Sequence, residues 1–135
     1  MKPLTTDFLT RSDKSVADAR RVLAINLPEQ AARLAYYSQF HAAQALIFER
    51  TGNIAKTHKG VRAQFHKLAK DDASIDRNLA GELTASYHYK EAADYQTGAA
   101  AVIDPADAVD AIRSAEHFLS VIKTVLTTST GNLAP

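Results

Sequence analysis

Apolar residues recur at helical spacing along most of the chain, and the breaks between these stretches mark five expected helices. They cover about residues 6–26, 28–50, 57–70, 74–95 and 104–126. Pro28 and the Asp104-Pro105 pair predict helix starts, because proline suits the first helical turn and aspartate caps it. Gly52 predicts a helix end. No strand pattern appears, so we expect an all-α protein, an antiparallel bundle of four to five helices.

The second expected helix differs from the others, because its apolar residues lie on every side of the helical wheel. A helix of this kind is buried nearly all round. Four other helices are too few to cover it completely, so we expect a homodimer. Arg33, Tyr37, His41 and Gln44 form one polar stripe on this helix. The stripe bonds to neighbouring helices, rims a subunit contact, or lines a groove that faces the polar end of the fourth helix, YHYKEAADYQTG, residues 87–98.

Length and composition limit the class of protein. A chain of 135 residues fits one domain, which we expect over residues 1–127, followed by a disordered tail over 128–135. There is no cysteine, which excludes disulfides and thiolate metal sites and favours the cytoplasm. The net charge of +1 gives no strong overall field, so contact with nucleic acid would need a local basic patch. Polar residues interrupt the apolar second helix, and we therefore expect no membrane span.

The histidines do not predict a metal site. His58, Arg62 and His66 lie on one helical face, but the middle residue is a cation, and no His-x-x-x-His pair is present. First-row metals require several neutral or anionic ligands that converge. No glycine-rich phosphate loop follows a strand, which excludes nucleotide-binding folds of that type. We expect neither a metal nor another cofactor.

Four stretches of the chain read AARLAYYSQFHAAQALIFERTG, KTHKGVRAQF, KEAADYQTG and DAIRSAEHFLSVIKTVL. In their order and spacing, over roughly residues 10–126, they resemble the HEPN family of small helical domains. The resemblance implies a four- to five-helix bundle that is often a homodimer. It also implies a small nucleotidyltransferase as partner in a toxin–antitoxin-like pair, and RNA cleavage without a metal in some members.

Nuclease members of that family carry an arginine followed, after four to six residues, by a histidine, and no arginine and histidine of this chain have that spacing. The resemblance places Lys90 at the arginine position and Tyr95 at the histidine position. Lysine keeps the charge but lacks the planar fork that grips phosphate at two points. A phenol, with an ordinary pKa near 10, is a poor general base at neutral pH. These residues favour binding over cleavage.

The expected groove gives the candidate site residues. RNA or a nucleotide is expected to contact Lys90, Asp94, Tyr37, His58 and Arg62. If the chain cleaves RNA, the catalytic candidates are Lys90 as phosphate clamp, Tyr95, and His41 or His58 as acid or base.

Three alternatives to this site stay open. Lys90 and Asp94 are four residues apart and are also placed to form an ordinary ion pair on a helix surface. In the second alternative the chain is an adaptor: its KEAADY end docks a partner protein, and no nucleotide binds. In the third alternative it is a substrate, in which Tyr95 or Tyr89 is nucleotidylated by the partner enzyme.

Overall fold

The protein is a bundle of five α-helices, seen in a computed structural model that describes residues 1–95 and 103–132, with side chains as far as residue 128. The helices are α1 (Pro3–Ala24), α2 (Pro28–Thr51), α3 (His58–Asp71), α4 (Asn78–Tyr95) and α5 (Pro105–Asn132). No strand occurs within these ranges. The predicted all-α class is confirmed.

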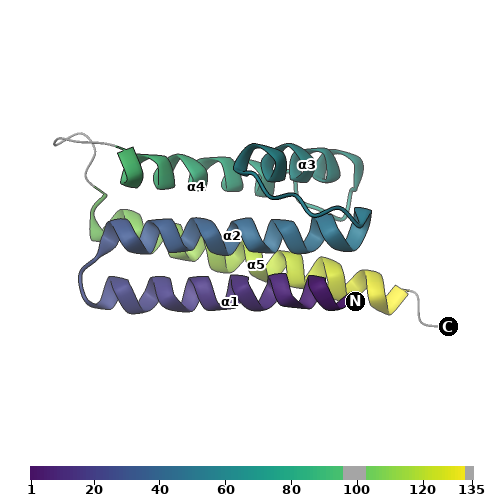
Figure 1. Cartoon of the computed structure of the whole chain (residues 1–135), viewed down its shortest axis with the longest axis horizontal. Helices are drawn as coiled ribbons and strands as arrows, with labels where there is room; N and C mark the ends of the chain where they lie inside the picture. The colour runs from purple at the N-terminus through teal and green to yellow at the C-terminus, as the bar shows by residue number, and fades with distance from the viewer. Residues whose placement is uncertain (96–102, 133–135) are drawn as a thin grey trace.

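The five helices lie in layers around α2 (Figure 1). α1 runs along one side of α2, α3 and α4 lie along the opposite side, and α5 crosses behind. α2 contacts each of the other four helices. The predicted burial of α2 on nearly every side is therefore correct, but the reason given for a homodimer is wrong, because helices of the same chain already cover it. Among its residues, Ala35, Tyr36, Ala42 and Leu46 are fully buried.

Local signals set several helix ends as predicted. Gly52 ends α2 in the left-handed conformation, with φ of 75°, and its N–H donates to the carbonyl of Phe48 at 2.9 Å. Asp104 caps α5: its Oδ1 accepts the N–H of Asp107 at 2.8 Å, while a carboxylate oxygen of Asp107 accepts the N–H of Asp104 at 3.2 Å. This reciprocal pair satisfies two of the free N–H groups at the start of α5.

Other helix boundaries differ from the prediction. α1 begins at Pro3, three residues early, since proline suits its first turn. α4 begins at Asn78 instead of near residue 74, because two turns precede it. The carboxylate of Asp72 accepts the N–H of Ser74, and the carboxylate of Asp76 accepts the N–H of Asn78, each at 2.9 Å. These hydrogen bonds stabilise the turns. The predicted end of the fourth helix at residues 97–98 lies outside the described part of the chain.

α5 is longer than the apolar pattern indicated. It ends at Asn132, so residues 128–132, expected in a tail, continue the helix. The apolar stripe stops at Leu126, but no proline follows before residue 132 to interrupt the backbone hydrogen bonds. The spacing of apolar residues indicates which part of a helix is buried, but it does not indicate where the helix ends.

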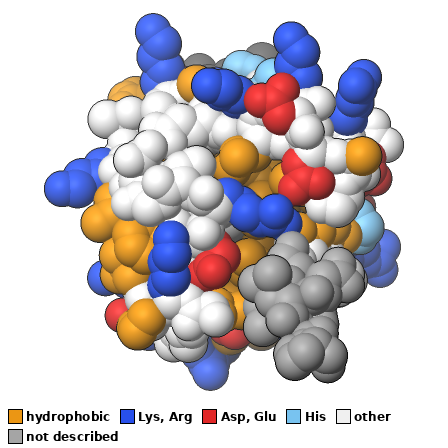
Figure 2. Space-filling view, turned by 90° about the vertical axis from the view of Figure 1, so that its right-hand side faces the viewer, with side chains coloured by type: hydrophobic (Ala, Val, Ile, Leu, Met, Phe, Trp, Pro, Cys, Tyr) orange, Lys and Arg blue, Asp and Glu red, His pale blue; other side chains and the backbone are white. Residues whose placement is uncertain are grey.

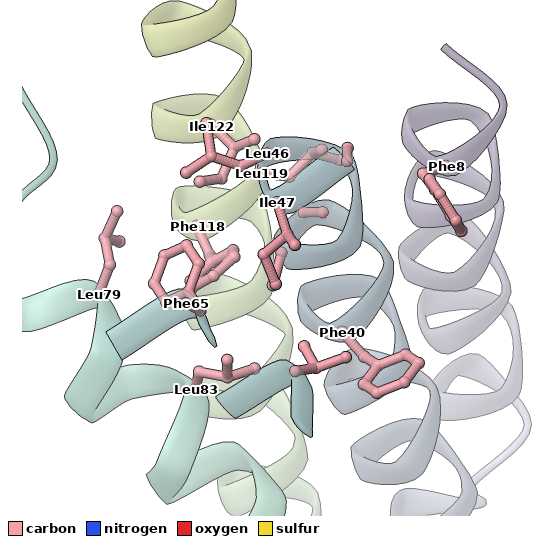
Figure 3. Packing of buried hydrophobic residues seen from close by; sticks show 14 of the residues in the cluster. Phe8, Phe40, Leu46, Ile47, Phe65, Leu79, Leu83, Phe118, Leu119 and Ile122 are labelled. Atoms are coloured by element: carbon pink, nitrogen blue, oxygen red, sulfur yellow. The ribbon is translucent and has the colours of Figure 1, made fainter. Parts of the chain in front are cut away.

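The main core lies between α2, α3, α4 and α5 and extends to Phe8 and Leu9 of α1 (Figure 3). Phe65 of α3 and Phe118 of α5 are fully buried, and their ring centres are 5.2 Å apart. Leu46 and Ile47 of α2 and Leu83 of α4 approach this aromatic pair in Figure 3. The core thus fixes the position of α3 and α4 over α2, which brings the polar end of α4 next to the polar stripe of α2.

Candidate functional site

The polar end of α4 is tied to α2 through one shared carboxylate. Asp94 pairs with Lys90 of the same helix, Nζ to Oδ2 at 2.7 Å, and with Arg33 of α2, Nε to Oδ1 at 2.6 Å. Arg33 also donates to the backbone carbonyl of Ala93 at 2.6 Å and to the side chain of Gln30. Arg33 of the polar stripe therefore bonds to the neighbouring helix α4, which is the first of the alternatives predicted for the stripe. Because Arg33 joins the pair, Lys90 and Asp94 form more than a pair on a helix surface.

These charges lie largely out of solvent. The side chains of Lys90, Asp94 and Arg33 are 11%, 21% and 30% exposed. The hydrogen bond with Asp94 raises the pKa of Lys90. Burial pushes the pKa of Asp94 upward, but the hydrogen bonds from Lys90 and Arg33 outweigh it and hold this pKa below its ordinary value. Two cations thus share one carboxylate, and the cluster carries a net positive charge.

His58, the first residue of α3, lies in a ring of aromatic side chains beside these charges. Its ring centre is 5.5 Å from that of Tyr36, 6.0 Å from Tyr37, 5.2 Å from Phe40 and 5.6 Å from Tyr87. Its Nδ1 shares a hydrogen bond of 2.8 Å with the hydroxyl of Tyr36.

The surroundings of His58 also set its charge. Burial lowers its pKa, and the nearby cations Lys90 and Arg62 lower it further. The imidazole is therefore neutral at pH 7. Burial raises the pKa of Tyr36, so its phenol stays protonated and can donate to the imidazole.

Arg62 of α3 lies over Tyr87 of α4, next to His58. Its guanidinium lies 4.0 Å from the centre of the Tyr87 ring, and its Nε donates to the carbonyl of His58 at 3.4 Å. The carboxylate of Glu91, one turn further along α4, raises the pKa of the Tyr87 phenol. The structure thus brings together the five predicted binding residues at the meeting point of α2, α3 and α4.

His41 lies at the edge of this group, with its ring centre 6.4 Å from that of Tyr37. Its Nδ1 shares a hydrogen bond of 2.8 Å with Oε1 of Gln44, and Nε2 of Gln44 donates to the carbonyl of Ala55 at 2.9 Å. Burial lowers the pKa of His41, the Gln44 bond raises it, and Arg11 of α1 lowers it. The residues of the polar stripe therefore have different partners. Arg33 forms its ion pair with Asp94 of α4, whereas His41, one turn after Tyr37, forms its hydrogen bond with Gln44 of its own helix.

Tyr95, the last residue of α4, is 74% exposed. Its hydroxyl lies close enough to Lys90 to contribute, after Asp94, to the raised pKa of that lysine. Tyr89, the other tyrosine considered for modification, is 36% exposed. Tyr95 is thus the more exposed of the two tyrosines considered for modification.

Sequence reasoning missed three side chains of this group. Arg33 belonged to the recognised polar stripe, yet nothing local indicated that it would share Asp94 across 61 residues. Tyr36 looked like an ordinary core residue, although its hydroxyl bonds to His58. Glu91 stands directly beside Lys90 in the quoted motif, but its effect on the pKa of Tyr87 was not anticipated.

The arrangement suits recognition of a phosphate group beside an aromatic surface. The three cations supply positive charge, and the tyrosine and histidine rings supply faces on which a base can stack. No group of three His, Cys, Asp or Glu side chains within residues 1–95 and 103–128 is placed to hold a metal ion. None of the helices in the described part is long and apolar enough to cross a membrane.

Comparison with known proteins places the chain in one family. The model of the HEPN domain matches residues 5–125. A UPF0332 protein of Archaeoglobus fulgidus is 25% identical over 115 residues, which cover 85% of this chain and 89% of that protein. The crystal structure of TT1696 from Thermus thermophilus has the same fold, with a TM-score of 0.78 at 18% identity, covering 91% of this chain and 98% of that chain. The domain match extends over nearly the whole bundle, and the protein therefore belongs to the HEPN domain family.

Proposed function

We propose that the protein binds RNA or a nucleotide at the cluster of Arg33, Lys90, Asp94, His58 and Arg62, as the HEPN member of a pair with a small nucleotidyltransferase. The observation that carries the proposal is the side chain of Lys90. It is only 11% exposed and is held by one carboxylate that Arg33 also shares. Removing a cation from water costs free energy, so a cation kept there with excess positive charge suits an anionic ligand.

The aromatic side chains next to these charges define the kind of anion. Tyr37 and His58 lie with their ring centres 6.0 Å apart, and Tyr87 lies beneath Arg62. A ligand with a phosphate can pair with Lys90, and if it also carries a planar base, that base can stack on these rings. Nucleotides and single-stranded RNA have this combination.

Substitution of Lys90 tests this proposal against a matched control. Lys14 and Asp18 of α1 form the same pair of residue types four positions apart, at 2.8 Å, but the side chain of Lys14 is 73% exposed. Lys90→Ala should weaken binding of AMP, ATP or a short RNA by about tenfold, the loss of one charge-assisted hydrogen bond. Lys14→Ala should leave binding unchanged. Equal affinities for the wild type and Lys90→Ala by isothermal titration calorimetry would remove the proposal.

Ribonuclease activity is a narrower form of the same proposal. Metal-free cleavage needs a base for the 2′-hydroxyl, an acid for the leaving oxygen and a cation for the phosphorane. Lys90 contributes to the lowered pKa of His58, and His58 is neutral at pH 7. This pair suits the roles better than His41, whose Nδ1 is held by Gln44 of its own helix. If the chain cleaves RNA, its expression should degrade cellular RNA and slow growth, and both effects should disappear in Lys90→Ala and His58→Gln but persist in His41→Gln.

A second candidate function is that of a substrate for the partner enzyme, favoured by the 74% exposure of Tyr95. The phenol lies at the surface next to the positive charge of Lys90, which suits the approach of a nucleoside triphosphate. Co-expression with a nucleotidyltransferase should then add the mass of one or more nucleotides to the protein. Mass spectrometry of Tyr95→Phe, with Tyr89→Phe as control, locates the modified residue, and an unchanged mass of the wild type would count against this function.

The homodimer is also a proposal, supported by the family resemblance and no longer by the burial of α2. Sedimentation equilibrium at micromolar concentration tests it. A monomer under these conditions would leave the chain as a one-to-one partner or adaptor. Thermal-shift measurements that show no response to AMP, ATP or short RNA would favour the adaptor.

A further inference from the structure

α3 and the residues before it form the most basic part of the molecule. Residues 51–70 include no aspartate or glutamate, and they contain Lys56, Lys59, Arg62, Lys67 and Lys70. Because the whole chain has a net charge of only +1, the remainder carries more acidic than basic side chains. Figure 2 shows Lys, Arg and His side chains along the upper edge of the molecule, where α3 lies. Residues 51–70 thus form a basic stretch in a nearly neutral protein.

A cavity of about 350 Å³ opens between the second half of α3 and the start of α4. Three cationic or titratable side chains line it: His66 and Lys70, one turn apart on α3, and Arg77, which directly precedes α4. Its remaining lining is small and apolar, formed by the buried residues Ala69 and Ala80. A small anion can therefore enter between the three side chains without a clash with bulky groups.

Two acidic residues of the turn between α3 and α4, Asp72 and Asp76, have partners of their own. Asp72 pairs with Arg50 at 3.2 Å and accepts hydrogen bonds from both the N–H and the hydroxyl of Ser74. Asp76 accepts the N–H of Asn78 at 2.9 Å. Within the described residues, no carboxylate pairs with the three side chains that line the cavity. The start of α4 adds the positive end of its helix dipole on the same side.

We propose that this cavity is a phosphate-binding site formed by His66, Lys70 and Arg77. The planar guanidinium of arginine suits two oxygens of one phosphate, while the lysine ammonium supplies a compact positive charge with three N–H donors and the histidine ring supplies an N–H donor. This site is separate from Lys90 and Asp94 and does not depend on the function proposed for them. The phosphate belongs either to a small molecule or to the backbone of a nucleic acid strand that continues along α3.

Amide chemical shifts in NMR titrations test this site directly. The titrations use inorganic phosphate, with sodium chloride at matched ionic strength as reference, and a short RNA that lacks a terminal phosphate. Phosphate should shift the amides of residues 66–80, and sodium chloride should not. Lys70→Ala should weaken the phosphate affinity by about tenfold. Lys67→Ala is the matched control, because Lys67 has the same charge on the same helix but lines a different hollow, beside Asp71.

The outcomes separate the two sources of phosphate and the two sites. Shifts with phosphate alone indicate a small phosphorylated ligand, and shifts with both probes indicate a nucleic acid backbone. The response should persist in Lys90→Ala, whatever happens to binding at the site around that lysine. Absence of shifts at residues 66–80 with both probes would overturn the proposal. Equal loss in Lys70→Ala and Lys67→Ala would also overturn it, because the response would then reflect overall charge.

Discussion

Replacement of Asp94 by asparagine removes the one negative charge of the cluster while keeping the size of the side chain. Arg33 and Lys90 would then face each other without a carboxylate, on side chains that are 30% and 11% exposed. Hydrogen bonds to charged groups contribute about 1.5–3 kcal/mol each. Breaking a fully buried pair costs about 3–5 kcal/mol, and these side chains retain some contact with water. We expect Asp94→Asn to lower the free energy of unfolding by about 2 kcal/mol, or Tm by roughly 8 °C.

The chain provides a matched control for this change. Asp18 of α1 also serves two cations, Lys14 at 2.8 Å and Arg21 at 2.6 Å, but these side chains are 73% and 75% exposed. Solvent screens such pairs, so Asp18→Asn should change Tm very little. Urea titrations of both variants at neutral pH measure the difference. If the two variants lose the same stability, the partial burial of the Asp94 cluster has no energetic consequence and the reasoning is wrong.

The effect of Asp94 should also depend on pH in a defined direction. The pKa of Asp94 is lowered in the folded protein, so its contribution is present above the ordinary carboxyl pKa near 4. The contribution is lost as pH falls through the lower value of the folded state. The stability curves of the wild type and Asp94→Asn should therefore converge in acid. A difference that stays constant down to about pH 2 would show that the asparagine acts through its shape and not through charge.

Further substitutions test the packing and the surroundings of the site, each by urea titration. Gly81→Ala should raise the free energy of unfolding by about 0.5–1 kcal/mol, because nothing lies within 4 Å of the added Cβ. Gly60→Ala should give no such gain, since its Cβ would lie 2.7 Å from Oγ1 of Thr57, the cap of α3; equal gains would contradict this geometry. Phe65→Ala should cost about 3–5 kcal/mol, as the ring is fully buried, and a much smaller loss would mean that the core closes around the gap. Burial lowers the pKa of His58, so its contribution to stability is present above the ordinary pKa near 6.5 and is lost as pH falls through the lower folded value. His58→Gln should flatten this part of the pH profile, and an unchanged profile would assign it to other groups.

The sequence by itself determined the helical class and several of the helix ends. Pro28, Gly52 and Asp104 act on backbone groups within a single turn, so their effects can be read without knowledge of the rest of the fold. Where short side chains compete for the same backbone groups, the prediction was less exact. The start of α4 is an example, because two aspartates hold turns where apolar spacing suggested a helix.

Only the tertiary structure decided which polar side chains meet. Helical spacing placed Arg33 and His41 on one stripe, but packing directs Arg33 to Asp94 on α4, while His41 bonds to Gln44 on its own helix. The contact between Arg33 and Asp94 joins residues 61 positions apart. Periodicity defines the faces of a helix, whereas the angle at which helices cross, and so the residues that touch, depends on how the whole core fills its volume.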